Sequence, residues 1–301
     1  MKPLWVKWLR RLVAYGIIRS LIKIGEVLPA TLGKPLFRSL GKISYYLFAK
    51  SRQIAIANLR FALGSQASDK EIRSIAKTTF ANLGGFAYDV VQARRKGCAY
   101  LEKMVVVKGK HNLDNALARG KGVIALTGHV GNWELLAAYF SMTGYPLNVL
   151  ATSLRDSRLN SLLVKMREDV GLRVLDRSRG LIQAFRCLKR GEILGVLIDQ
   201  DTSVESVIVD FLGKPAKTAV GPVKLAMRTG AAIVPLAMLM TDNGQYEIEV
   251  KQPLEIVGSE KSLERDVETC SKAIEEFIKR KPTQWVWMHK RWKSVLGEIY
   301  N

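Results

Sequence analysis

The chain has 301 residues, of which 48% are hydrophobic and 25% charged, ample for a folded core in one or two domains. Lys and Arg total 47 against 27 Asp and Glu. The formal net charge of +20 favours acidic partners such as phosphate-bearing lipids, an acidic carrier protein or nucleic acid. The three cysteines and three histidines are scattered, which excludes the usual cysteine- and histidine-rich metal and redox motifs and fits a reduced, cytoplasm-facing chain.

Residues 1–30 are predicted to form an interfacial membrane-anchor helix. The stretch from Leu4 to Lys23 is apolar, but basic residues interrupt it, so no uncharged run approaches the roughly 20 residues that span a bilayer. The same interruptions fit poorly with a secretory signal peptide. Trp and Leu beside Lys and Arg are typical of a helix lying in the headgroup layer, where basic residues suit anionic lipid. The alternative is a soluble amphipathic helix packed on the rest of the protein.

Residues 31–301 are predicted to form a single domain with a helical part, 31–104, and an α/β part, 105–301. In the helical part, one helix is expected from about Asp69 to Arg95. In the α/β part, short apolar strands alternate with helices, which predicts a mostly parallel sheet flanked by helices on both faces. The expected strands cover residues 105–107, 123–126, 147–150, 174–175, 193–199, 233–238 and 245–250, and the expected helices cover 135–140, 160–170, 181–188, 218–228 and 263–279.

The stretch from Val123 to Leu136 is predicted to carry the chemistry. An apolar run rich in β-branched residues, bounded by Gly122 and Gly128, is typical of a buried strand, and a helix follows it. His129 lies in the turn between the two. Open α/β sheets build their sites in such turns, at the carboxyl ends of strands.

His129 and Glu134 are five residues apart, so on one continuous helix they would point about 140° apart. Gly128 and Gly131 allow the chain to bend, and Glu134 could then reach a ring nitrogen of His129. Such a carboxylate would fix the tautomer and stabilise the imidazolium, which predicts a general base and its orienting residue. No serine or cysteine nucleophile is needed if the substrate brings its own hydroxyl. Alternatively, Glu134 occupies a capping-box position after Gly131, and His129 is an ordinary turn residue.

Motifs spread along the chain resemble a known family. The stretch from Gly128 to Glu134 resembles the H-x4-D/E block of membrane glycerolipid acyltransferases. Its Asn-Trp-Glu form resembles the late lipid A acyltransferases, a family that also includes mycobacterial phosphatidylinositol mannoside acyltransferase. Further blocks that follow the family's order run from Arg52 to Leu59, Ile198 to Asp201, Phe211 to Pro235 and Pro282 to Lys293.

One departure from the motifs of related acyltransferases narrows the choice of acceptor molecule. Glycerol-3-phosphate and lysophosphatidate acyltransferases carry a Phe-Pro-Glu-Gly-Thr-Arg block after the second motif. Here that place holds the stretch from Val209 to Pro215. A simple glycerol phosphate acceptor is therefore disfavoured.

The resemblance implies a glycerolipid acyltransferase-like fold and transfer of a fatty acyl chain to a hydroxyl of a lipid A precursor. The implied donor is acyl-acyl carrier protein, whose acidity the basic surface would attract, or acyl-CoA. No cofactor or metal is implied. The implied location is the cytoplasmic face of the inner membrane, with the anionic membrane surface as a partner. Two alternatives stay open: acylation of another membrane lipid, such as a mannosylated inositol lipid or an aminolipid, and a non-catalytic basic protein that binds membrane or nucleic acid. The spread of the basic residues and the lack of a nucleic-acid motif in the sequence argue against nucleic acid.

Five further residues are substrate-binding candidates. Asp199, at the end of a buried strand, is expected to shape the acceptor site, with a cap on the following turn as the alternative. Arg155, Arg158 and Arg167 surround a helix, and their planar guanidinium groups suit a phosphorylated glycolipid. Arg167 ranks first because it best matches a family position, and a solvated basic face is the alternative. Asn132, inside the first motif, is also expected to bind substrate.

The aromatic C-terminal tail is open to two interpretations. Trp285, Trp287 and Trp292 lie beside basic residues at 290, 291 and 293. This composition suits an anchor at the membrane interface. The same alternation suits tryptophans packed in the core beside a basic rim.

Overall fold

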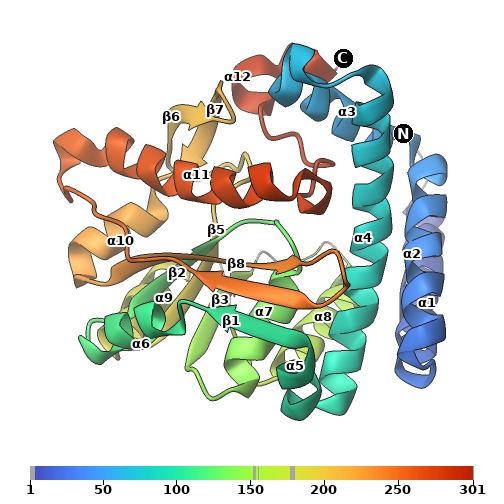
Figure 1. Ribbon diagram of the computed structural model, residues 1–301, viewed down its shortest axis with the longest axis horizontal. Helices are drawn as coiled ribbons and strands as arrows, with labels where there is room; N and C mark the ends of the chain where they lie inside the picture. The colour runs from blue at the N-terminus through green and yellow to red at the C-terminus, as the bar shows by residue number, and fades with distance from the viewer. Residues whose placement is uncertain (1–3, 152–153, 155, 177–179, 301) are drawn as a thin grey trace.

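A seven-stranded sheet forms the centre of the protein in the computed structural model, which describes residues 4–151, 154, 156–176 and 180–300 (Figure 1). The strands lie in the order β1-β9-β8-β2-β5-β3-β4. Strands β8 and β9 pair antiparallel, and the other neighbouring strands pair parallel. The prediction of an α/β fold with a mostly parallel sheet is therefore confirmed. The bounds are β1 (Val105–Lys108), β2 (Val123–Thr127), β3 (Leu147–Ala151), β4 (Arg173–Asp176), β5 (Ile193–Leu197), β8 (Ala232–Met240) and β9 (Tyr246–Val250).

Helices cover both faces of the sheet, because successive side chains of a strand point to opposite faces. Ala125 of β2 packs with α6 (Lys110–Ala118) and α7 (Trp133–Met142) in one apolar cluster. Ile124 and Leu126 pack in a second cluster with α9 (Gly180–Lys189), α10 (Gly221–Thr229) and α11 (Leu263–Arg280). Helix α8 (Ser157–Glu168) packs beside β4. Burial on both faces explains why the central strands read as continuous apolar runs.

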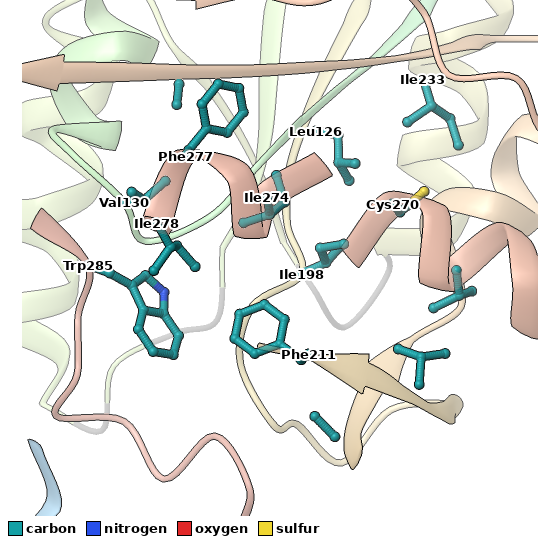
Figure 2. Packing of buried hydrophobic residues seen from close by; sticks show 14 of the residues in the cluster. Leu126, Val130, Ile198, Phe211, Ile233, Cys270, Ile274, Phe277, Ile278 and Trp285 are labelled. Carbon is teal, nitrogen blue, oxygen red and sulfur yellow. The ribbon is translucent and has the colours of Figure 1, made fainter. Parts of the chain in front are cut away.

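Figure 2 shows the second cluster from close by. Ile274 and Phe277 of α11 are buried there with Leu126 of the sheet. Trp285 and Val130, which come from the C-terminal segment and the turn after β2, belong to the same cluster (Figure 2). The turn that holds His129 is therefore backed by packed side chains.

In the described part of the chain, five α-helices precede the first strand. Helix α4 begins with a capping box in which the Ser68 and Glu71 side chains each bind the other's backbone N–H. Helices α2 and α4 cross closely, since a Cβ at Gly41 would lie 2.2 Å from the Phe80 carbonyl oxygen. Helices α1 and α2 lie on the outer side of α4, away from the sheet (Figure 1). The bounds are α1 (Leu4–Val27), α2 (Ala30–Leu47), α3 (Ala49–Leu63), α4 (Asp69–Lys96) and α5 (Cys98–Met104).

None of the helices in the described ranges combines the length and apolarity needed to cross a membrane. The interfacial position of residues 1–30 stays a prediction. The division between that segment and one domain over residues 31–301 likewise stays a prediction.

A hairpin replaces the start of the helix predicted over residues 218–228. Strand β6 (Ser206–Phe211) pairs antiparallel with β7 (Lys214–Ala219), so α10 begins only at Gly221. The two loop residues, Leu212 and Gly213, have φ angles of 54° and 75°. Tight two-residue hairpin loops require positive φ, which the sequence signals most clearly with Asn-Gly or Asp-Gly. Because Leu212 stands at the first loop position, that signal is missing from the sequence.

Candidate functional site

His129 and Asp199 face each other at the carboxyl ends of two adjacent parallel strands. Thr127 of β2 is in register with Leu197 of β5, and each site residue follows two positions later. His129 Nδ1 lies 2.8 Å from Asp199 Oδ1. The His129 backbone N–H also donates to Asp199 Oδ2 at 2.7 Å. The carboxylate therefore holds both the ring and the backbone of the histidine.

Asp199 is buried, with 2% of its surface exposed, and its oxygens are satisfied by donors. Trp285 Nε1 donates to Oδ2 at 2.7 Å. Burial alone would raise the pKa of the Asp199 carboxyl, but the charge of His129 and the hydrogen bonds from His129 and Trp285 lower it to about 2. The residue is thus an anion at physiological pH. Gly128 leaves room for it, since a Cβ there would lie 3.0 Å from the Asp199 carboxyl carbon.

The turn after β2 is fixed from two sides. Gly131 has a φ of 62°, and a Cβ on it would lie 1.8 Å from the Met238 carbonyl oxygen, so only glycine fits. Its N–H donates to the Gln284 carbonyl at 2.8 Å, and the Val286 N–H donates to the His129 carbonyl at 3.1 Å. Strand β8 and the C-terminal segment thus hold the histidine loop between them.

The prediction that Glu134 contacts His129 is wrong. Its carboxylate contacts Arg167 and not His129: Arg167 Nε and Nη2 donate to the two Glu134 oxygens at 3.0 Å and 2.5 Å. Glu134 lies in the first turn of α7, and Arg167 lies in the last turn of α8. The bend between His129 and Glu134 does form, but Asp199 occupies the Nδ1 side of the ring. The capping-box alternative does not hold either, because the Asn132 side chain caps α7.

A largely apolar cavity of about 700 Å³ opens beside these groups. His129, Glu134 and Arg167 all line it, whereas Asp199 does not. Because Asp199 accepts from Nδ1, the other ring nitrogen, Nε2, is the one available to a molecule in the cavity. Nε2 makes no hydrogen bond to any described residue. A histidine ring nitrogen and an arginine guanidinium therefore face a largely apolar space.

The other substrate-binding candidates lie elsewhere. Asn132 is buried and serves as the N-cap of α7, accepting from the Leu135 N–H at 3.2 Å, so its place inside the motif reflects helix capping. Arg158 pairs with Asp156 at 2.9 Å and does not line the cavity. Arg155 lies outside the described residues. Asp199 belongs to the site, but as the buried partner of His129 and not as a wall that touches substrate.

The C-terminal tryptophans pack in the core. Trp285 and Trp287 are each 1% exposed and Trp292 is fully buried, so the interpretation of this tail as an interfacial anchor is wrong. The rings of Trp285 and Trp287 meet edge to face with centroids 4.5 Å apart. Arg291 is also buried and donates to the Thr218 hydroxyl at 2.6 Å.

The family model described as bacterial lipid A biosynthesis acyltransferase matches residues 6–294. The chain belongs to this family. A lipid A biosynthesis lauroyltransferase of Escherichia coli K12 is 24% identical over 297 residues, covering 96% of this chain and 92% of that protein. A lipid A biosynthesis acyltransferase of Haemophilus influenzae is 23% identical over 241 residues, covering 79% of this chain and 74% of that protein.

A second group of relatives is mycobacterial. A phosphatidylinositol mannoside acyltransferase of Mycobacterium tuberculosis is 27% identical over 201 residues, or 64% of this chain. The chain spans 61% of the length of that relative. The family resemblance seen in the sequence motifs is therefore confirmed.

Two features of the site were not predicted from the sequence. The Asp199–His129 contact was missed because spacing does not reveal that β2 and β5 are neighbours. The Trp285 contact to Asp199 joins residues 86 positions apart. The available signal was that His129 and Asp199 each follow a buried strand, since the carboxyl ends of parallel strands meet at one edge of a sheet.

Proposed function

We propose that this protein transfers a fatty acyl chain from a thioester donor to a hydroxyl group of a glycolipid. The observation that carries the proposal is the His129–Asp199 pair, whose histidine opens on a largely apolar cavity. Such a cavity suits a hydrocarbon chain, and the base at its edge suits deprotonation of an incoming hydroxyl.

His129 is the general base in this mechanism. An ionised carboxylate only accepts hydrogen bonds, so Asp199 keeps the proton of the neutral ring on Nδ1 and leaves Nε2 as the base. As the acceptor oxygen attacks the thioester carbonyl carbon, Nε2 takes the hydroxyl proton. When the tetrahedral intermediate collapses, the C–S bond breaks and the imidazolium returns that proton to the departing thiolate. Asp199 stabilises the positively charged ring throughout.

Arg167 supplies positive charge on the cavity wall. Two of its five N–H groups bind Glu134, so the guanidinium is held in one orientation with donors to spare. In that orientation it stabilises the oxyanion or binds an acceptor phosphate. Glu134 thus acts on Arg167, a role that differs from the orientation of His129 predicted from spacing.

The family supports a lipid A precursor as the acceptor. The printed names of the Escherichia coli and Haemophilus relatives point the same way. The mycobacterial relatives support a second acceptor, a mannosylated inositol lipid. The net charge of +20 favours the acidic acyl-acyl carrier protein as donor, with acyl-CoA as the alternative.

We also propose that α1 and α2 hold the protein on the cytoplasmic face of the inner membrane. Both helices lie on the outer side of α4 (Figure 1) and expose large apolar side chains: Trp5, Trp8, Ile17, Val27, Leu32 and Leu47 are each at least half exposed. Exposed Arg11, Arg19 and Lys23 lie among those of α1, as an anionic lipid surface requires.

The direct test incubates the purified protein with a donor, acyl-acyl carrier protein or acyl-CoA, and an acceptor, a lipid A precursor or a mannosylated inositol lipid. Mass spectrometry measures the acylated product. The product is expected with wild type, and its formation should fall about 10²–10⁴-fold in His129→Ala. Transfer that survives in His129→Ala would remove the base from the mechanism. No product from any donor and acceptor pair would overturn the proposed function.

A further inference from the structure

Strand β5 carries a glycine at its centre that no backbone requirement explains. Gly195 lies between β2 and β3 in the sheet, and its φ is not positive. A Cβ on Gly195 would meet no backbone atom closer than 3.6 Å, the nearest atom being Val149 Cγ1 at 3.3 Å. The backbone there therefore tolerates a side chain. A glycine inside a strand costs stability and often marks a place where a ligand approaches closely.

The cavity explains why a glycine stands at position 195. Gly195 lines it, and the residue is partly exposed although its strand lies inside the sheet. Its neighbours in register, Ala125 on β2 and Val149 on β3, line the cavity as well. The three residues lie on the α7 face of the sheet, the face of the cluster that holds Ala125 and Leu136. Of these three residues, Gly195 alone has no side chain.

This part of the cavity is deep along the strand direction. Thr127 and Leu197 line it at the level of the His129 turn, and Ile193 and Leu147 line it four residues further from that turn. At about 3.3 Å per residue, the depth is roughly 13 Å, with Gly195 about halfway. On the opposite wall, Phe140 lies six residues beyond Glu134 along α7, about 9 Å deeper at 1.5 Å per residue.

The residues beyond Gly195 are apolar. Leu113, Phe140, Leu147, Leu172 and Ile193 line the cavity there. An extended alkyl chain whose thioester lies at His129 reaches this lower part only by passing the open face of Gly195.

We propose that Gly195 sets the length of acyl chain that the protein accepts, because its missing side chain opens the lower half of the cavity. The inference rests on the proposed function and adds a specificity-determining residue to it. A side chain at position 195 narrows the passage to the lower half of the cavity. Acyl chains that end before this position still fit, whereas longer acyl chains no longer do.

The cavity has a second lobe, which provides a matched control. Gly221, Pro222 and Leu225 of α10 line it on the other face of the sheet. A Cβ added at Gly221 would meet nothing within 4 Å. Gly221→Ala therefore adds one methyl group to the same cavity outside the path proposed for the acyl chain.

The experiment compares lauroyl, myristoyl and palmitoyl donors on purified wild type, Gly195→Ala, Gly195→Val and Gly221→Ala. The ratio of kcat/KM for palmitoyl to that for lauroyl is expected to fall in Gly195→Ala and by about 10-fold or more in Gly195→Val. Gly221→Ala should keep the wild-type ratio. Circular dichroism checks folding, and Gly195→Ala alone decides the matter if the valine variant does not fold.

Two outcomes overturn the inference while the proposed function stands. In the first, wild type transfers acyl chains and the Gly195 variants keep its chain-length ratio. In the second, Gly221→Ala shifts the ratio and Gly195→Ala does not, which would place the acyl chain in the second lobe. Failure of wild type to transfer any chain to any acceptor is a different result, because it rejects the proposed function itself.

Discussion

At the scale of single residues, the site consists of two hydrogen-bonded pairs with different tasks. Asp199 binds His129, and Glu134 binds Arg167. The sequence placed His129 and its turn correctly, since a short apolar strand, a glycine and a helix are all local features. It could not choose between Glu134 and Asp199 as the partner of the histidine. That choice depends on the register of β2 with β5, which only the packed sheet determines.

Asp199→Asn should lower turnover by about 10²–10⁴-fold, because an amide can donate to Nδ1 and so favour the tautomer whose Nε2 carries the proton. The measurement is kcat at saturating donor and acceptor. Asp201→Asn is the matched control: Asp201 follows the same strand, but its carboxylate binds the N–H and hydroxyl of Ser294. Equal losses in both variants would show that the strand end, and not the contact with His129, matters.

Arg167→Lys should reduce transfer even though the charge is kept, because an ammonium group cannot replace a planar fork with two bonds to Glu134. The loss should persist at saturating acyl-acyl carrier protein and at raised salt, since a partly buried pair is screened less than a surface pair.

The matched control for this variant is Arg190→Lys. Arg190 forms the same two-bond pair with Glu192 and does not line the cavity, so its change should leave transfer unaltered. Recovery of Arg167→Lys with excess donor would instead make Arg167 a residue that steers the carrier protein.

At the scale of elements, the sequence predicted most strands because they are short apolar runs, as in β5. Helix α4 was marked instead by its acidic first turn and by the basic residues in its last turn, which precede Gly97. The β6–β7 hairpin was missed because its loop residue Leu212 adopts a positive φ that leucine rarely takes. The outward position of α1 and α2 was not predictable either, since an amphipathic pattern does not say which neighbour covers the apolar face.

Removing residues 1–25 should shift the protein from the membrane fraction towards the soluble fraction, because the deletion removes exposed Trp5, Trp8 and Ile17. Carbonate extraction measures the shift. Trp5→Ser combined with Trp8→Ser should give part of the effect. Ile182→Ser removes an equally exposed apolar side chain from α9 and should give none. A truncated chain that resists extraction like the full one would place the attachment in another segment.

At the scale of the whole molecule, folding stability depends on carboxylates that stay ionised at low pH. Hydrogen bonds from Arg190 and Arg158 lower the pKa of Glu192 and Asp156 to about 2, and Asp199 reaches the same value against its burial. A carboxyl whose folded pKa is depressed stabilises the folded state above its unfolded pKa. That stabilisation is lost as pH falls through the folded value.

The unfolding temperature should therefore change little between pH 7 and pH 5 and then fall steadily as the pH approaches 2. Scanning calorimetry across this range measures the slope. The slope should be shallower in Asp199→Asn, which has no carboxyl to protonate at that position. An unchanged slope in this variant would mean that Asp199 binds its proton equally in the folded and unfolded chain.

The contacts between the histidine loop and the C-terminal segment also join parts of the chain that are synthesised at different times. Helix α1 leaves the ribosome before His129 and Asp199, and Gln284, Trp285 and Val286 follow only much later. A growing chain can therefore display its exposed N-terminal helix long before the last tether of the histidine loop exists. If α1 binds lipid and His129 is the base, as proposed, membrane attachment can precede catalysis during translation, because a chain that stops short of residue 284 lacks these tethers.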